Sequence, residues 1–115
     1  MPRTFLDSIV GTNTTDVTNT TAQDVVATAS VGTGKRLLIA NITVTNKTAA
    51  ETPVIQIKDD SGNVLDTFAP GAGPTSVYRQ YVSKIPVPAG EGVTAEATTA
   101  TGDCLVTVNG DLVST

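Results

Sequence analysis

The sequence predicts a single all-β domain, an antiparallel β-sandwich or jelly roll that carries an extended N-terminal arm. Alternating apolar and polar stretches recur at about the 8–12-residue spacing typical of sandwiches and barrels, with turn-forming residues between them. The composition favours strands, because nearly one residue in five is threonine and valine is abundant. No stretch has a convincing helical pattern. At 115 residues the chain is expected to form one core.

Residues 1–21 differ in character from the rest and are predicted to form the extended arm, with one weak edge strand, while residues 22–115 form the sandwich. The arm is rich in threonine and asparagine and holds few residues that build a core. Its apolar side chains must pack either on the body of the domain or on a neighbouring molecule. These side chains are Phe5, Leu6, Ile9 and Val10.

The next two strands are predicted at residues 23–29 and 37–45. In the first, Val25 is expected on one face with Ala27 and Ala29, and Val26 on the other. In the second, strict alternation indicates a half-buried antiparallel strand. Its core face is expected to hold Leu38, Ala40, Ile42 and Val44.

Two residues at the start of this second strand break the alternation. Leu37 and Ile39 are apolar but fall on the face expected to meet water. Either a loop of the same chain covers them or another subunit does. Both explanations remain open at this point.

The middle of the chain predicts a hairpin at residues 53–69, with strands 54–58 and 64–68 joined by an Asp/Ser/Gly/Asn turn. The Gly/Pro-rich residues 69–74 are expected to form a surface loop. A strand carrying both tyrosines is expected at 75–83. Residues 85–88 contain two prolines and therefore belong to a sheet edge or a strand entry.

The C-terminal third repeats this pattern. Residues 93–98 alternate cleanly, and 104–108 and 112–113 are expected as two further short strands. Turns are expected at 101–103 and at 109–111, where glycine stands beside aspartate or asparagine.

Composition excludes several classes of function. The chain has no histidine, no tryptophan and one cysteine, which removes most side chains that build catalytic and metal sites. We therefore expect no enzyme activity, no cofactor and no metal. The net charge is −4 and the basic residues are scattered, so nucleic-acid binding is not expected. The sequence shows neither a secretory signal nor a membrane-spanning apolar run.

Local motifs receive structural interpretations. Residues 32–35 resemble the end of a phosphate-binding loop, but the preceding glycine and the following Ser/Thr are missing, so they predict a turn. Asp59, Asp60 and Asn63 lack EF-hand spacing and are interpreted as the hairpin turn rather than a cation site. Four Asn-X-Thr triplets are attributed to the abundance of threonine. They begin at Asn13, Asn19, Asn41 and Asn46.

Three further side-chain groups are candidates for functional sites. Cys104 alternates with valines and is expected to be a small buried hydrophobe, because no base is available to activate it. Tyr78, Arg79 and Tyr81 carry the rings and the guanidinium that suit a sugar-binding face, but the two tyrosines fall on opposite faces of an ideal strand and do not form one platform unless a bulge intervenes. The spacing of Glu91 and Glu96 does not indicate a carboxylate pair for hydrolysis.

The overall layout resembles the small β-sandwich or jelly-roll virion proteins of tailed bacteriophages, especially the decoration (cement) proteins of the head. The resemblance lies in the Thr/Asn-rich arm followed by residues 35–46, 85–93 and 106–110. It implies a structural protein located in the virion and made in the host cytoplasm. It further implies assembly as a homotrimer, with the major capsid protein or another virion protein as partner, where it clamps neighbouring capsomers.

The sequence nominates six residues for contact with such a partner, because they are apolar and lack an obvious place in the core. They are Phe5, Leu6, Ile9, Val10, Leu37 and Ile39. Two alternatives to the decoration role stay open: a receptor- or glycan-binding module, and a structural protein of the tail or connector.

Overall fold

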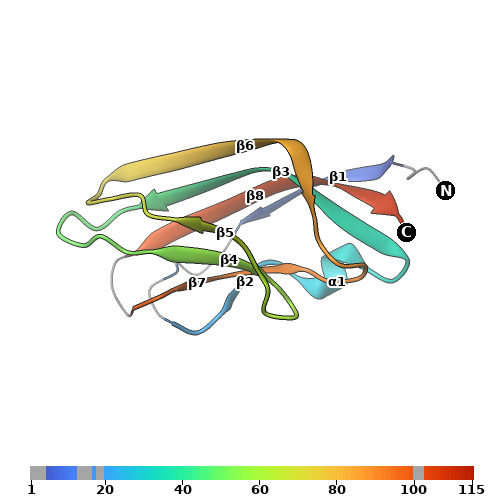
Figure 1. The fold of residues 1–115 in the computed structure, drawn as a ribbon, viewed down its shortest axis with the longest axis horizontal. Helices are drawn as coiled ribbons and strands as arrows, with labels where there is room; N and C mark the ends of the chain where they lie inside the picture. The colour runs from blue at the N-terminus through green and yellow to red at the C-terminus, as the bar shows by residue number, and fades with distance from the viewer. Residues whose placement is uncertain (1–4, 13–16, 18–19, 100–102) are drawn as a thin grey trace.

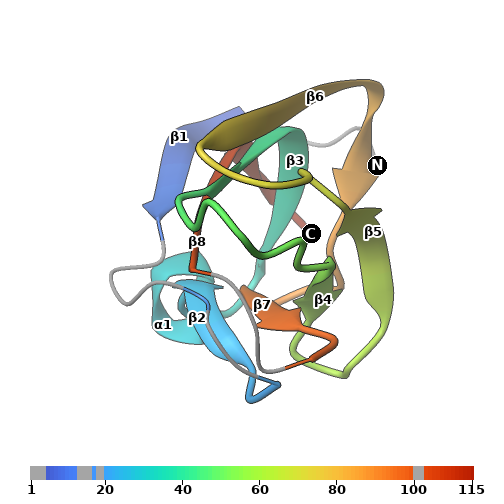
Figure 2. The same cartoon turned by 90° about the vertical axis from the view of Figure 1, so that its left-hand side faces the viewer.

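The computed structural model describes residues 5–12, 17, 20–99 and 103–115. They form two four-stranded sheets that pack face to face, as Figures 1 and 2 show. In order across the first sheet lie β1 (Phe5–Thr12), β8 (Cys104–Ser114), β3 (Lys35–Asn46) and β6 (Thr75–Pro86). In order across the second lie β2 (Gln23–Val26), β7 (Val93–Ala97), β4 (Ile55–Asp59) and β5 (Val64–Phe68).

The strands pair from the two ends of the chain inward. β1 pairs with β8, β2 with β7, β3 with β6 and β4 with β5, all antiparallel. Pairing of β3 with β8 and of β4 with β7 completes the sheets. This nested order is that of an eight-stranded jelly roll. The predicted all-β sandwich or jelly roll is confirmed, as are the 54–58/64–68 hairpin within one residue and the loop at 69–74.

The core between the sheets is built mainly from small and medium apolar side chains. β8 contributes alternate residues, beginning with Cys104 and Val106, and β4 contributes Ile55 and Ile57, all fully buried. Phe68 is the only aromatic among the fully buried side chains of the described residues. Each such side chain stabilises the fold by about 1.5–3 kcal/mol, so stability is spread over many contacts.

A β-bulge interrupts β3 near its middle. Ile39 pairs with Gly110 of β8, whereas Asn41 pairs with the adjacent Asn109, which leaves Ala40 as the extra residue. One extra residue exchanges the two faces of a strand, because side chains alternate with a period of two. Odd-numbered residues of β3 therefore lie on the core side of the sheet before Ala40, and even-numbered residues lie on it afterwards.

The bulge corrects the predicted alternation in β3. Leu37 and Ile39 face the core before the bulge, and Ile42 faces it afterwards, all three with no exposed surface. The expectation that Leu38 and Ala40 share the core face with Ile42 was wrong, since both are only partly buried.

The turn expected at 109–111 was also wrong, because β8 continues through Gly110 to Ser114. A Cβ atom at Gly110 would lie 2.4 Å from the backbone oxygen of Leu38 and 2.9 Å from Leu37 Cδ1. Glycine at this position thus permits the close approach of the bulged β3 and does not make a turn.

β6 forms one edge of the first sheet and bulges more strongly. Ile39 pairs with Ile85 and Asn41 with Gln80, so two steps along β3 correspond to five along β6. Val82, within this bulge, is fully exposed. The prediction of an edge near residues 85–88 is confirmed, although β6 runs on to Pro86 and does not end at residue 83.

At the opposite edge, the segment predicted as an arm contains β1, which pairs with β8. Gly11 brings β1 against β2, since a Cβ there would lie 2.3 Å from Val26 Cγ2. The strand predicted at 23–29 ends at Val26 and is followed by the short helix α1 (Thr28–Val31), which was not expected. Val25 and Val26 are both buried, because a register shift interrupts the alternation of β2.

Candidate functional site

The residues nominated for partner contact divide between the surface and the interior. Phe5 and Leu6 lie on β1 with 60% and 46% of their surface exposed. Ile9 is partly buried and packs against the core. Val10 lies on β1 opposite Asn109, but its side chain is outside the described part of the chain.

Leu37 and Ile39 are placed in the core of the chain itself, with no exposed surface. The chain therefore covers them without a second subunit, and the Ala40 bulge is the reason that the pattern was misread. Phe5 and Leu6 remain as the exposed members of the nominated set.

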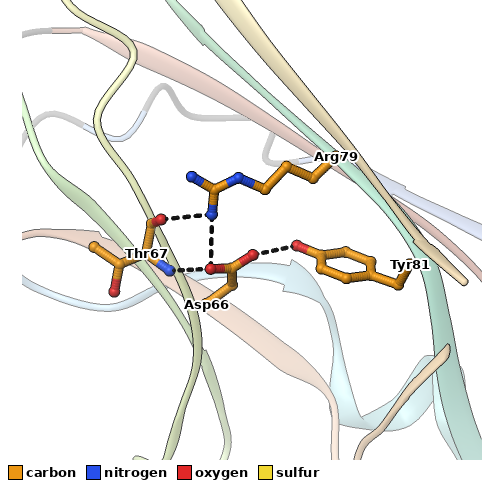
Figure 3. A network of polar contacts seen from close by, with 4 residues as sticks. All are labelled: Asp66, Thr67, Arg79 and Tyr81. Atoms are coloured by element: carbon orange, nitrogen blue, oxygen red, sulfur yellow. Dashed lines mark hydrogen bonds and ion pairs between the residues drawn. The ribbon is translucent and has the colours of Figure 1, made fainter. Parts of the chain in front are cut away.

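Polar side chains join the two sheets at the edge formed by β5 and β6 (Figure 3). Asp66 lies on β5, and Arg79 and Tyr81 lie two residues apart on β6. The Tyr81 hydroxyl donates a hydrogen bond of 2.5 Å to Asp66 Oδ2, and Arg79 Nη1 lies 2.7 Å from Oδ1. The same nitrogen donates to the Thr67 carbonyl at 2.8 Å. We call these four residues the inter-sheet clamp.

The clamp shifts the titration of its acidic groups. Burial tends to raise the pKa of Asp66, but hydrogen bonds from Tyr81, Arg79 and Thr67, with the Arg79 charge, together hold it below its usual value of 3.8. Burial and the neighbouring Asp66 carboxylate raise the pKa of the Tyr81 hydroxyl. Arg79 also lies over the Phe68 ring, 4.3 Å from its centroid.

The two tyrosines do not form a joint platform. Tyr78 is 57% exposed and lies opposite Thr43 of β3, whose side chain points away from the core. Tyr81 is partly buried and directs its hydroxyl to Asp66, as Figure 3 shows. Sequence reasoning singled out Arg79 and Tyr81 but missed Asp66, because no local pattern shows which strands meet across a sandwich.

The hairpin turn considered as a cation site is held by hydrogen bonds. Asp59 Oδ1 accepts the backbone N–H groups of Ser61 and Asn63 at 3.0 and 2.9 Å. Burial tends to raise the Asp59 pKa, yet the hydrogen bonds from Asn63, Ser61 and Gly62 together lower it. Within the described ranges, no group of three or more His, Cys, Asp or Glu side chains is arranged to hold a metal ion.

This turn is fastened to two neighbouring segments. Asp60 accepts hydrogen bonds from the Thr28 hydroxyl of α1 and, at 2.7 Å, from the Gly92 N–H. Glu91 accepts the Ser61 N–H at 2.9 Å, whereas Glu96 lies 2.8 Å from Lys58, so the two glutamates do not act as a pair. The carboxylates at this end thus organise loops.

At the far end of the sandwich a buried amide organises the other loops. Asn46 has no exposed surface, and its Nδ2 donates to the carbonyls of Glu51 and Gly71 at 2.9 and 2.7 Å. Its Oδ1 accepts the Thr48 N–H at 3.0 Å. One side chain therefore ties the β3–β4 connection to the β5–β6 connection, at the left of Figure 1. Cys104, which pairs with Asn46, is buried as predicted.

A feature that sequence reasoning missed is an open pocket of about 220 Å³ where β3 begins and β6 ends. Its lining residues are Arg36, Pro86, Val87 and Pro88. The Nε atom of Arg36 is buried and has no hydrogen-bond partner among the described residues. No sequence signal pointed here, because the pocket depends on how residues 86–88 lie against β3.

The described residues contain no helix long and apolar enough to cross a membrane. No protein-family model matches the chain, and no curated protein sequence matches it.

Comparison with solved structures does find similar folds. A chain in the acid-stable capsid structure of Helicobacter pylori bacteriophage KHP30 matches with a TM-score of 0.63 and 12% identity, over 96% of this chain and 91% of that one. A chain in the capsid asymmetric unit of cyanophage Pam1 matches with a TM-score of 0.53 and 17% identity, over 96% and 90%. At these identities the similarity establishes a shared fold.

Proposed function

We propose that this chain is a structural protein of a bacteriophage particle, and specifically a decoration protein that binds the head and stabilises neighbouring capsomers. The supporting observation is the near-complete match, in both directions, to chains of two phage capsid structures. About nine-tenths of each neighbour is covered, so those chains are of about this size. The proposed partners are the major capsid protein or another virion protein, together with further copies of this chain as a trimer.

The surface chemistry is compatible with this role. Phe5 and Leu6 present apolar side chains at one edge of the first sheet, and Val82 does so in the bulge at the other edge. Single exposed apolar residues are common on monomers, but exposed edge strands are sites at which other chains add. The chain lacks histidine, and the carboxylates of Glu91, Glu96 and Asp66 are engaged in a loop contact and ion pairs, which favours a binding role over an enzymatic one.

The test is immunogold electron microscopy of particles purified from the source, with an antibody raised against this chain. Gold distributed over the heads is the expected result. Label confined to the tail would overturn the decoration role in favour of a tail or connector protein. Particles without label, with the epitope shown to be accessible, would overturn the virion assignment itself.

A binding experiment tests which edge meets the particle. We expect Phe5→Ser to weaken binding of the purified chain to particles that lack it. Val64→Ser is the matched control, because Val64 is 50% exposed on β5 of the other sheet. Deletion of residues 2–20 is less informative, since it removes β1 and uncovers the edge of β8.

A further inference from the structure

Arg36 stands out among the described basic residues because its side chain is partly buried and has no partner among them or the other described residues. The other described basic residues that are partly buried have acidic partners, Lys58 with Glu96 and Arg79 with Asp66, and the exposed Lys84 pairs with Asp111. The Arg36 side chain makes no hydrogen bond or ion pair with the described residues, and its Nε is buried. A guanidinium stays charged and carries five N–H donors, so the terminal nitrogens of Arg36 can donate to an acceptor from outside the chain.

The surroundings of Arg36 define what that acceptor must look like. Pro86, Val87 and Pro88 form the rest of the pocket wall, and Val87 is held in place by its N–H bond of 2.9 Å to the Leu37 carbonyl. The pocket therefore combines one guanidinium with an apolar wall. A carboxylate beside an apolar side chain has the matching chemistry.

The N-terminal half of β1 carries such a combination. Phe5, Leu6 and Asp7 are consecutive and all exposed. Among the described residues, the Asp7 carboxylate hydrogen-bonds only with the N–H of the next residue, Ser8, which occupies Oδ1 at 2.8 Å. The other described acidic side chains have partners in turns, ion pairs or other contacts.

Asp7 and Arg36 of one molecule are not positioned to meet. Phe5 lies opposite Val113 of β8, and Val113 lies opposite Arg36 of β3, so β8 separates the two strands by roughly 10 Å. Asp7 lies opposite Leu112, whose side chain faces the core side of the sheet. Arg36 lies opposite Val113, the next residue of β8, and so falls on the other face of the sheet. A second molecule is needed to bring them together.

We propose that the Arg36 pocket binds the Phe5–Asp7 segment of a second copy of this chain, with the Asp7 carboxylate paired to the Arg36 guanidinium and an apolar side chain of the segment against Pro86 and Pro88. The charge complementarity is specific, because it joins a partly buried cation to an exposed carboxylate, and among the described residues neither Arg36 nor the Oδ2 atom of Asp7 has a partner. The contact supplies Arg36 with an acceptor that the described part of its own chain does not provide. It gives the self-assembly in the proposed function a defined site.

The experiment is sedimentation velocity over a concentration series, in low salt and again in high salt. Four variants accompany the native chain: Arg36→Glu, Asp7→Lys, the double variant carrying both, and Lys35→Glu. The last is the matched control, because Lys35 is an exposed neighbour of Arg36 and its substitution changes the net charge equally.

We expect the native chain to self-associate, more weakly at high salt. Each single charge reversal at the proposed contact should weaken association by about a hundredfold, and the double variant should recover most of it. The Lys35→Glu control should associate almost as the native chain does. A monomeric native chain, or association that survives either single reversal, would overturn the proposal.

Thermal unfolding separates this contact from a merely structural role of Arg36. Because its Nε is unsatisfied, Arg36→Met should leave the melting temperature of the dilute subunit unchanged or raise it, while association is lost. A lowered melting temperature in Arg36→Met would identify Arg36 as a structural residue instead. None of these measurements needs the particle, so they fail or succeed separately from the immunogold test.

Discussion

Tyr81 of β6 donates a hydrogen bond of 2.5 Å to Asp66 of β5, and this bond joins the two sheets at an edge where no backbone pairing links them. The same carboxylate holds Arg79 at 2.7 Å. The Asp66 carboxylate thus links the two sheets at the β5–β6 edge. At the opposite edge, the two sheets are in contact through the close packing of Gly11 of β1 on β2.

The first prediction concerns removal of that carboxylate. We expect Asp66→Ala to lower the free energy of unfolding by about 1–3 kcal/mol, because Arg79 and Tyr81 then lose a shared acceptor. Tyr81→Phe, which removes one hydrogen bond and keeps the ring, should lower it by about 0.5–1.5 kcal/mol. Urea denaturation followed by circular dichroism measures both. Equal stability of Asp66→Ala and the native chain would show that the clamp does not stabilise the fold.

The second prediction concerns pH. The pKa of Asp66 lies below 3.8 in the folded chain, so its ionised form is favoured by folding. Its stabilisation is complete above the unfolded pKa and is lost as the pH falls through the folded pKa. The difference in unfolding free energy between the native chain and Asp66→Asn should therefore shrink between about pH 5 and about pH 2. A difference that stays constant over this range would contradict the assignment.

The third prediction exchanges the buried amide of Asn46 for a carboxyl group. In Asn46→Asp, an oxygen replaces the Nδ2 that donates to the carbonyls of Glu51 and Gly71. Burial next to two carbonyl oxygens should raise the folded pKa of the new carboxyl, so the variant loses stability as the pH rises. Asn46→Ala is the control, since it removes the same bonds without a titrating group. Parallel pH profiles for the two variants would contradict the prediction.

The fourth prediction tests the bulge contact between β8 and β3. Gly110→Ala should destabilise the chain by about 1–3 kcal/mol, because the added Cβ meets the Leu38 backbone oxygen, which has little room to shift. Thr43→Ala, on the outward face of β3, is the control and should change stability by about 0.5 kcal/mol or less. Thermal unfolding of both variants at one pH gives the comparison.

The contrast between β4 and β3 shows which parts of the fold the sequence predicts. The β4–β5 hairpin was predicted almost to the residue, because its turn chemistry is local and β4 carries an unbroken alternation. β3 was misread over its first half because the Ala40 bulge depends on contact with β8, more than 60 residues away in the chain. The glycine that permits this contact, Gly110, was mistaken for part of a turn for the same reason.

The candidate sites were less predictable than the strands. Phe5 and Leu6 were nominated for partner contact because their segment is poor in core-forming residues, and that role stays a prediction. Asp66 and Arg36 were not nominated, because their surroundings arise from strands that meet only in three dimensions. Nothing in the sequence around Arg36 distinguishes a paired basic side chain from an unpaired one.

The inter-sheet clamp also gives the protein an optical signal of its own. The chain has no tryptophan and two tyrosines, so its intrinsic near-ultraviolet fluorescence comes from Tyr78 and Tyr81. Tyr78 is exposed, whereas the Tyr81 hydroxyl is bound to a carboxylate, an environment that quenches tyrosine emission. A Tyr78→Phe variant would therefore keep one tyrosine, Tyr81. Its fluorescence intensity would report whether the Tyr81–Asp66 hydrogen bond joins the two sheets at this edge.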